Sequence, residues 1–280
     1  MKYKVLAIDL DGTLLAKKYK ISQDNVQALS KFIDLGGIVC FVTGRSLTSA
    51  KNVADKFEVL SHGKKVRYIA CLNGTLLYDN WKNEYVEENT LSPEVASKIL
   101  TICKNNHLSF ASYTRNGILQ KTMGVYGYKG WTWLINLMNK KTKINYVNKL
   151  DDEDVVYKIN VLRKMSKAKF TKVEEELKDV CICGLDISKT SHWLYEITKH
   201  GANKGNSVIR LSELLNVPLD EFVAFGDSAN DISMFKLVGL PIAARQKYKQ
   251  ILPYVKYAMS KPQKNAVARA MNQYVFPYLK

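Results

Sequence analysis

The sequence has few of the features that mark secreted and membrane proteins. Its 280 residues include five cysteines, an odd number, and Cys40 and Cys71 lie inside short apolar runs. This pattern is typical of reduced, buried thiols rather than of a disulfide framework. No apolar run is long enough to span a bilayer, and the first residues lack the three regions of a signal peptide. We therefore expect a cytoplasmic protein that does not bind membranes.

Acidic residues are scarce relative to basic ones. The chain has 26 Asp and Glu against 42 Lys and Arg, a formal net charge of +16. Such an excess attracts nucleic acid or anionic substrates in general. Here it is spread over single lysines and short pairs such as Lys17-Lys18, without an aromatic RNA-binding signature or a long basic helix. We interpret it as a lysine-rich surface that focuses phosphorylated ligands. Nucleic acid is not expected as a partner, and a nucleic-acid-binding protein stays open only as a less favoured alternative.

Short apolar runs alternate with amphipathic segments near the start of the chain. Val5 to Ile8, Ile38 to Val42 and Arg67 to Leu72 predict buried strands, and the segments between them predict helices capped by Ser22 and Ser46. The same rhythm resumes after residue 200. Regular alternation of this kind predicts an α/β fold with a doubly wound, Rossmann-like parallel sheet, which binds ligands at the carboxyl ends of its strands.

The middle of the chain lacks this alternation, which predicts a separate α+β module inserted into the first domain. Its expected helices run from Pro93 to about Asn106 and from Lys167 to Leu177, and its expected strands are Phe110 to Tyr113, Val156 to Leu162, Val180 to Ile187 and Trp193 to Ile197.

Two carboxylates follow the first predicted strand. Asp9 and Asp11 stand two residues apart, and Gly12 permits a sharp turn there. A buried strand that ends in two carboxylates is costly unless a cation or a reaction needs them. The simple alternative is an Asp-Gly surface turn with one incidental aspartate. The functional interpretation is a nucleophilic aspartate beside a carboxyl that donates and accepts a proton.

Polar groups follow other predicted strands as well. Asp227 and Asp231 come after the strand Phe222 to Phe225, and several converging carboxylates would repel one another without a cation. Mg²⁺, which prefers oxygen ligands, would resolve this repulsion. Thr43 and Lys204 would supply the hydroxyl and the positive charge that a transferring phosphoryl group requires. Taken singly, these two are equally well explained as a turn residue and a surface lysine.

Four segments together resemble the ordered motifs of the haloacid dehalogenase (HAD) superfamily. They are Asp9-Leu10-Asp11-Gly12-Thr13, Thr43-Gly44-Arg45, Lys204 within Gly201 to Gly205, and Gly226-Asp227-Ser228-Ala229-Asn230-Asp231. The chain is most similar to the Cof-type (subfamily IIB) phosphatases, and the resemblance covers essentially its whole length. It implies a Rossmann-like catalytic core at residues 1–80 and 201–280, with an inserted α+β cap at 81–200 that selects the substrate.

The resemblance also implies Mg²⁺-dependent hydrolysis of phosphate monoesters through an aspartyl-phosphate. Asp9 would be the nucleophile and a metal ligand, and Asp11 would be the general acid and base, with its backbone carbonyl on the metal. The other implied roles are metal binding or its support by Asp227, Asn230 and Asp231, and phosphate binding by Thr43, Gly44, Asn73 and Lys204.

One segment departs from the family pattern. Where Cof-type relatives usually carry Met-Gly-Asn-Ala, this chain has Ala243-Ala244-Arg245-Gln246. Arg245 is either a ligand for an anionic substrate or an exposed loop residue.

These features predict a Mg²⁺-dependent phosphatase that acts on small phosphorylated metabolites. Sugar phosphates are the leading substrate class, and phosphorylated cofactors such as FMN or pyridoxal phosphate come next. The nearest alternative is a phosphomutase of the same superfamily, which would use the same nucleophile but return the phosphoryl group to a sugar. We expect a monomer or a weak homodimer.

Overall fold

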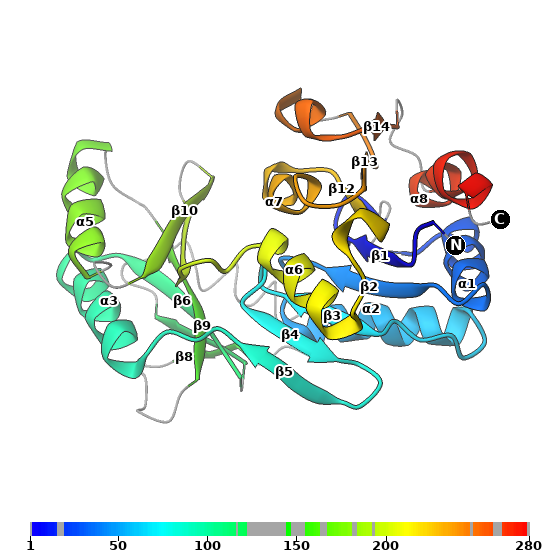
Figure 1. The fold of residues 1–280 in the computed structure, drawn as a ribbon. Helices are drawn as coiled ribbons and strands as arrows, with labels where there is room; N and C mark the ends of the chain where they lie inside the picture. Colours follow the sequence, from blue (N-terminus) through cyan, green and yellow to red (C-terminus); the bar gives the residue numbers. More distant parts are fainter. Residues whose placement is uncertain are drawn as a thin grey trace. The chain divides into compact units, whose positions relative to one another are not determined.

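The protein folds into two compact units, each built around its own sheet (Figure 1). The first unit combines Met1–Glu87 with Asn203–Lys280, and the second unit is Glu88–Ala202. The computed structural model describes residues 2–15, 20–115, 117–121, 144–146, 155–162, 167–180, 184–191, 194–246, 249–259 and 265–278.

The sheet of the first unit has eight strands in the order β14-β13-β12-β1-β2-β3-β4-β5. Neighbouring strands from β14 to β3 are parallel, and β4 runs antiparallel to β3. The expected doubly wound parallel sheet is therefore confirmed. The strands span Val5–Ile8 (β1), Ile38–Val42 (β2), Tyr68–Cys71 (β3), Leu76–Asp79 (β4), Glu84–Glu88 (β5), Phe222–Gly226 (β12), Leu240–Ala243 (β13) and Tyr257–Ala258 (β14).

Helices cover both faces of this sheet. Alternate residues of a strand point to opposite faces, and Val5 and Ala7 share a hydrophobic cluster with side chains of α6 and α7. Leu6 and Ile8 point the other way and are equally buried. The helices α1 and α2 contact β2 and β3, and α1 also contacts α8. The helices span Gln23–Asp34 (α1), Leu47–Leu60 (α2), Lys204–Leu215 (α6), Ile232–Phe235 (α7) and Ala266–Ala270 (α8).

The two serines that precede α1 and α2 make different contacts. Ser22 caps α1 as predicted, since its Oγ accepts a hydrogen bond from the backbone N–H of Asn25 at 3.3 Å. Ser46 is the N-cap residue of α2, as predicted, but its side chain makes no capping hydrogen bond. The hydroxyl oxygen of Thr43 instead accepts a hydrogen bond from the backbone N–H of Arg45 at 3.2 Å. This contact orders the turn between β2 and α2.

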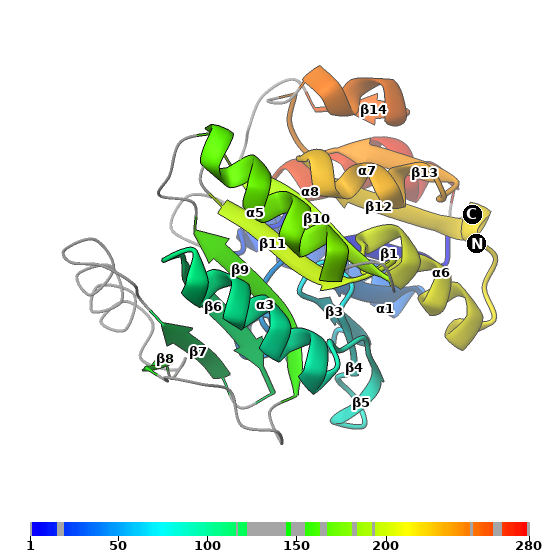
Figure 2. The same ribbon diagram turned by 90° about the vertical axis from the view of Figure 1, so that its left-hand side faces the viewer.

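The second unit is an α+β module, as expected. Its six-stranded sheet has the order β10-β11-β9-β6-β7-β8, antiparallel except for the β7–β8 pair. The helices α3 and α5 lie side by side over one face of it (Figure 2). The elements span Pro93–Asn105 (α3), Ser109–Thr114 (β6), Gly117–Lys121 (β7), Ile144–Tyr146 (β8), Val156–Leu162 (β9), Lys167–Val180 (α5), Leu185–Ser191 (β10) and Leu194–Lys199 (β11).

The predicted strand Val180 to Ile187 is wrong at Val180, where helix α5 ends, and residues 181–183 lie outside the described residues. The strand β10 begins at Leu185. Val173, Leu177 and Val180 pack in the same hydrophobic cluster. Their spacing of four and three residues continues the buried face of a helix, which explains why the helix extends this far.

The domain boundaries were expected at residues 80 and 200. The two units divide a few residues later, after Glu87 and after Ala202. The strand β5 extends the sheet of the first unit through its pairing with β4, so that unit continues to Glu87. The strands β7 and β8 were not expected from the sequence. None of the described helices is both long enough and apolar enough to cross a membrane.

Candidate active site

The first two carboxylates of the site are brought together by strand pairing. Asp9 follows β1 and Asp227 follows β12, and these strands pair in parallel with Ile8 opposite Phe225. The backbone N–H of Asp9 continues the ladder by donating to the carbonyl of Phe225 at 2.9 Å. Both aspartates are almost fully buried. The register of one strand pair thus places two buried carboxylates at the same edge of the sheet.

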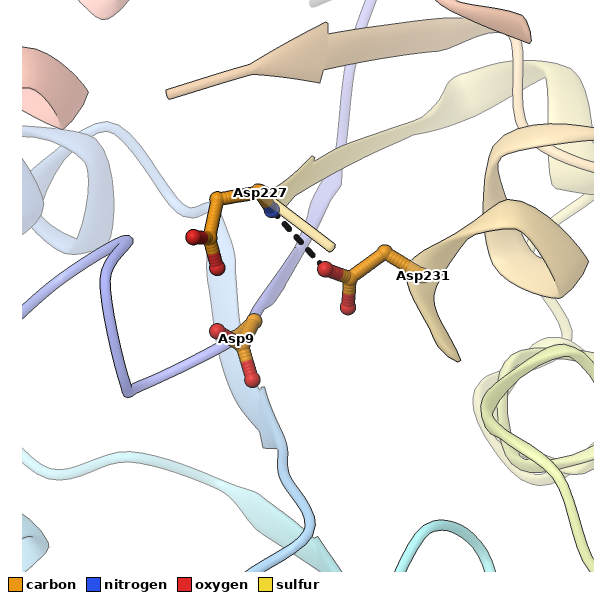
Figure 3. Close-up of side chains that lie close together, drawn as sticks. All are labelled: Asp9, Asp227 and Asp231. Atoms are coloured by element: carbon orange, nitrogen blue, oxygen red, sulfur yellow. Dashed lines mark hydrogen bonds between the residues drawn. The ribbon is translucent and has the colours of Figure 1, made fainter. Parts of the chain in front are cut away.

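Asp231 joins them through a tight turn after β12. Its Oδ2 accepts hydrogen bonds from the backbone N–H groups of Asp227 and Ser228 at 2.8 and 2.9 Å. A Cβ on Gly226 would lie 2.4 Å from the Cγ of Asp231, so a larger residue at position 226 would push this carboxylate away. Figure 3 shows the side chains of Asp9, Asp227 and Asp231 close together, and each offers an oxygen within 4.8 Å of the others.

Lys204 supplies a positive charge to this cluster. It is the first residue of α6, and the preceding Asn203 caps that helix by accepting a hydrogen bond from the backbone N–H of Asn206 at 3.0 Å. The Nζ of Lys204 donates to Oδ1 of Asp9 and to Oδ1 of Asp231, both at 2.6 Å. The lysine is completely buried. Its ammonium group is therefore held between two carboxylates without access to solvent.

The buried charges change one another's ionisation. The pKa of Asp9 is raised to about 7, chiefly by burial. Lys204 lowers this pKa, whereas the nearby carboxylates of Asp231 and Asp227 contribute to the rise. Burial also raises the pKa of Asp227, against the opposing effect of Arg245. Burial alone would lower the pKa of Lys204, but the carboxylates of Asp9 and Asp231 outweigh it and raise the pKa. Lys204 thus stays cationic, and the carboxyl group of Asp9 loses its proton at a higher pH than an ordinary aspartate does.

The three carboxylates fit a hard divalent cation. Such ions prefer oxygen ligands and relieve the repulsion between carboxylates that lie close together. Both oxygens of Asp231 already accept hydrogen bonds, from Lys204 and from the backbone. Oδ2 of Asp9 accepts none from the described residues, and Oδ1 of Asp227 accepts only a long one, at 3.5 Å, from Thr13. Asp9 and Asp227 are therefore the better ligands, and Asp231 holds Lys204 and the turn.

Asp11 lies outside this cluster. Its side chain is about half exposed and receives two hydrogen bonds from Arg45, from Nε to Oδ2 at 2.7 Å and from Nη2 to Oδ1 at 2.6 Å. Paired contacts of this kind fix the plane of the carboxylate. The side chain of Asp11 is accessible to solvent, whereas Asp9 is not.

The remaining predicted residues link neighbouring strand ends. Thr43 is buried after β2, and its carbonyl accepts a hydrogen bond from the backbone N–H of Asn73 at 3.0 Å. Asn73 has a positive φ of 59° and accepts a hydrogen bond at Oδ1 from Asn230 Nδ2 at 2.9 Å. A Cβ on Gly44 would lie 3.0 Å from this same oxygen. The ends of β2, β3 and β12 are thereby joined through Thr43, Asn73 and Asn230.

All the residues predicted for the site lie in the first unit, but only some of them touch one another. Asp9, Lys204, Asp227 and Asp231 form one buried cluster. The side chain of Asn230 contacts those of Ser228 and Asn73, and its support of a metal stays a prediction.

Arg245 contacts the site in a way that the sequence interpretation missed. Its Nε donates a hydrogen bond to Oδ2 of Asp227 at 2.6 Å, and its Nη2 forms an ion pair with the same oxygen. The sequence carries only a weak signal for this contact. Arg245 follows a weak strand pattern at Ile242 and Ala243, and a parallel strand beside β12 ends next to Asp227.

The comparison with known families identifies the chain. The model of the haloacid dehalogenase-like hydrolases matches residues 6–271, and the chain therefore belongs to this family. The resemblance based on the four motifs is confirmed, and the protein is a hydrolase.

Relatives and solved structures resemble the chain over nearly its whole length. It is 25% identical to a 5-amino-6-(5-phospho-D-ribitylamino)uracil phosphatase of Bacillus subtilis (strain 168), covering 97% of this chain and 96% of the relative. It is 23% identical to an HMP-PP phosphatase of Serratia proteamaculans (strain 568), covering 99% and 97%. A haloacid dehalogenase-like hydrolase from Bacteroides thetaiotaomicron has the same fold, with a TM-score of 0.81, 23% identity, and coverage of 97% and 99%.

Proposed function

We propose that the protein is a Mg²⁺-dependent phosphatase that hydrolyses small phosphorylated metabolites. The observation that carries this proposal is the buried cluster of Asp9, Asp227 and Asp231 around the ammonium group of Lys204. A cluster of this kind offers a carboxylate nucleophile, oxygen ligands for a cation and a fixed positive charge in one water-poor site. These are the elements that a transferring phosphoryl group requires.

In the proposed reaction, an oxygen of Asp9 attacks the phosphorus of the substrate. The bond to the alcohol oxygen breaks, and Asp11 gives that oxygen a proton. Water then attacks the phosphorus of the aspartyl-phosphate while the carboxylate of Asp11 accepts a proton from that water. The bond between phosphorus and the Asp9 oxygen breaks, which releases phosphate and restores both Asp9 and the protonated Asp11. Asp11 suits this role because its carboxylate is accessible to solvent. To reach the oxygen of the leaving alcohol, it must first break its ion pair with Arg45.

The other residues hold and orient the reacting groups. Bound Mg²⁺ would stabilise negative charge on the phosphoryl oxygens, with Asp9 and Asp227 as its carboxylate ligands and the backbone carbonyl of Asp11 beside them. Lys204 and Thr43 bind the phosphoryl group in this proposal, with support from Gly44 and Asn73. Asn230 and Asp231 support the metal site through the turn after β12.

We propose that the second unit is the cap that selects the substrate. Its sheet carries buried polar side chains, among them Lys158, which donates a hydrogen bond to Glu196 at 3.1 Å, and Asn160. The Oδ1 atom of Asn160 is buried and has no hydrogen-bond partner among the described residues. Such groups suit a hydroxyl-rich ligand. Sugar phosphates are therefore the leading class, and phosphorylated cofactors such as FMN or pyridoxal phosphate are next. We further propose a cytoplasmic monomer or weak homodimer.

The proposal is tested by replacing Asp9 and by removing metal. Asp9→Asn should abolish hydrolysis of an aryl phosphate, since an amide is not a competent nucleophile, while circular dichroism stays native. Asp55→Asn, an exposed aspartate on α2, is the matched control and should keep full activity. EDTA should inactivate the wild-type protein and Mg²⁺ should restore it. Persistent turnover by Asp9→Asn, or indifference to EDTA, would contradict the proposal.

The same assay distinguishes the alternative of a phosphomutase. A phosphatase releases inorganic phosphate from a sugar phosphate without any bisphosphate activator. A mutase returns the phosphoryl group to a sugar and depends on such an activator. A screen of phosphorylated metabolites for phosphate release would therefore identify both the reaction and the substrate.

A further inference from the structure

Arg245 reaches the site from a neighbouring strand end. The strand β13 pairs in parallel with β12, with Ala243 opposite Gly226, and the backbone N–H of Ala244 continues this ladder to the carbonyl of Gly226 at 2.9 Å. The next residue, Arg245, consequently begins beside Asp227. The register of the sheet therefore fixes the backbone from which the side chain of Arg245 extends, and this residue is not part of a free surface loop.

The backbone of the nucleophile turn leaves room for the guanidinium group. Gly12 has a φ of +86°, and a Cβ at this position would lie 2.1 Å from Nη2 of Arg245 and 2.6 Å from Oδ2 of Asp227. The guanidinium therefore fills the space that the absent side chain of Gly12 leaves open.

The contact between Arg245 and Asp227 places a positive charge beside a carboxylate that is a proposed metal ligand. Among the described residues, the ion pair that Asp227 forms is the one with Arg245. The Asp227 side chain is 2% exposed, whereas that of Arg245 is 27% exposed. A divalent cation on Asp227 would lie close to the guanidinium, and like charges at short range repel strongly in a partly buried site. Because the long arginine side chain reaches solvent, it can leave without creating a buried unpaired charge.

We propose that Arg245 is an intramolecular counter-cation of the metal site, which a divalent cation must displace from Asp227, so that Arg245 sets the affinity of the protein for that cation. This inference rests on the proposed function, because it requires a metal at Asp9 and Asp227. In the metal-free protein, Arg245 stabilises the carboxylate cluster. In the metal-bound protein, its guanidinium is released from Asp227.

Direct metal binding tests this inference. Mn²⁺, titrated into metal-free protein and followed by the electron paramagnetic resonance signal of the free ion, reports the dissociation constant without any substrate. Arg245→Gln removes the charge but keeps an N–H donor, and Arg245→Lys keeps the charge. Arg210→Gln is the matched control, since Arg210 is a partly exposed arginine on α6 that pairs with Glu87 and Glu213.

Arg245→Gln should bind Mn²⁺ at least about tenfold more tightly than the wild type, because a like charge next to the ligand is gone. Arg245→Lys and Arg210→Gln should bind like the wild type or nearly so. The thermal midpoint of Arg245→Gln should be lower than that of the wild type in EDTA, and Mg²⁺ should raise it by a larger amount. Equal Mn²⁺ affinities of wild type and Arg245→Gln would overturn the inference and leave the proposed function intact. Failure of every protein to bind Mn²⁺ would overturn both.

Discussion

Lys204 and Asp9 are 195 positions apart in the sequence, yet Nζ of the lysine donates a hydrogen bond to Oδ1 of the aspartate at 2.6 Å. The lysine shares a second contact of the same length with Asp231. Because all three side chains are buried, each depends on the others for the charge compensation that water would otherwise provide. The proposed chemistry of the site and the stability of the first unit therefore involve the same three residues.

Replacing Lys204 should destabilise the protein strongly. Lys204→Met leaves two buried carboxylates facing each other, and loss of one partner from a buried ion pair typically costs about 3 to 5 kcal/mol. Urea denaturation measures the loss. Combining Lys204→Met with Asp231→Asn should recover part of it, because one unpaired charge is removed. Lys56→Met, an exposed lysine on α2, should change the stability by less than about 0.5 kcal/mol. Equal effects of the two lysine variants would contradict this assignment.

The stability of the metal-free protein should depend on the ionisation of Asp9. Its pKa is raised from 3.8 to about 7, so between these values the native state holds a proton that the unfolded state has lost. The free energy of unfolding should therefore fall as the pH rises through this range. Urea denaturation in EDTA at a series of pH values measures the fall. The curve of Asp9→Asn should be flatter, and parallel curves for the two proteins would refute the prediction.

Gly12→Ala should lower the stability of the protein by more than the backbone strain at position 12 alone would. Gly12 and Gly36 have almost the same positive φ, +86° and +87°, but only at Gly12 would a Cβ meet other atoms. Gly36→Ala therefore measures the strain alone, which is about 1 kcal/mol. The additional loss of stability in Gly12→Ala reflects the displacement of Arg245 and Asp227. The difference between the two variants should shrink when both are made in an Arg245→Ala background. An equal cost at both glycines would mean that the guanidinium does not occupy this space.

Asp11→Asn should impair turnover with little effect on stability. The Asp11–Arg45 pair is partly exposed, and ion pairs of this kind contribute about 0 to 1 kcal/mol. Loss of the proposed general acid and base should slow kcat by about 10²- to 10⁴-fold. Steady-state kinetics and thermal denaturation of the same preparation separate the two effects. Unchanged kcat would remove Asp11 from the proposed mechanism.

The location of the site could be predicted because it follows from topology. The carboxyl ends of parallel strands meet at one edge of a sheet, so polar residues after β1, β2, β3 and β12 had to converge. The cluster of Asp9, Asp227 and Asp231 is the direct result.

The pairing of side chains within the site could not be predicted in the same way. The contact between Arg245 and Asp227 depends on the register of β13 against β12, and β13 has only a short apolar pattern. The single turn that carries Asp231 depends on the absence of a side chain at Gly226. In the second unit, Val180 fits both a strand and a helix pattern, and only its packing with Val173 and Leu177 selects the helix.

The position of β1 between β2 and β12 has a consequence for vectorial synthesis. As the chain leaves the ribosome, β1 can pair with β2 early, but β12 emerges only after the entire second unit. Domains generally fold as units in the order of their synthesis, so the second unit can fold while the sheet around β1 is still incomplete. Asp9 meets Lys204, Asp227 and Asp231 only at the end. A nascent chain of this protein consequently lacks the carboxylate cluster around Lys204 until synthesis has passed Asp231, within the last quarter of the polypeptide.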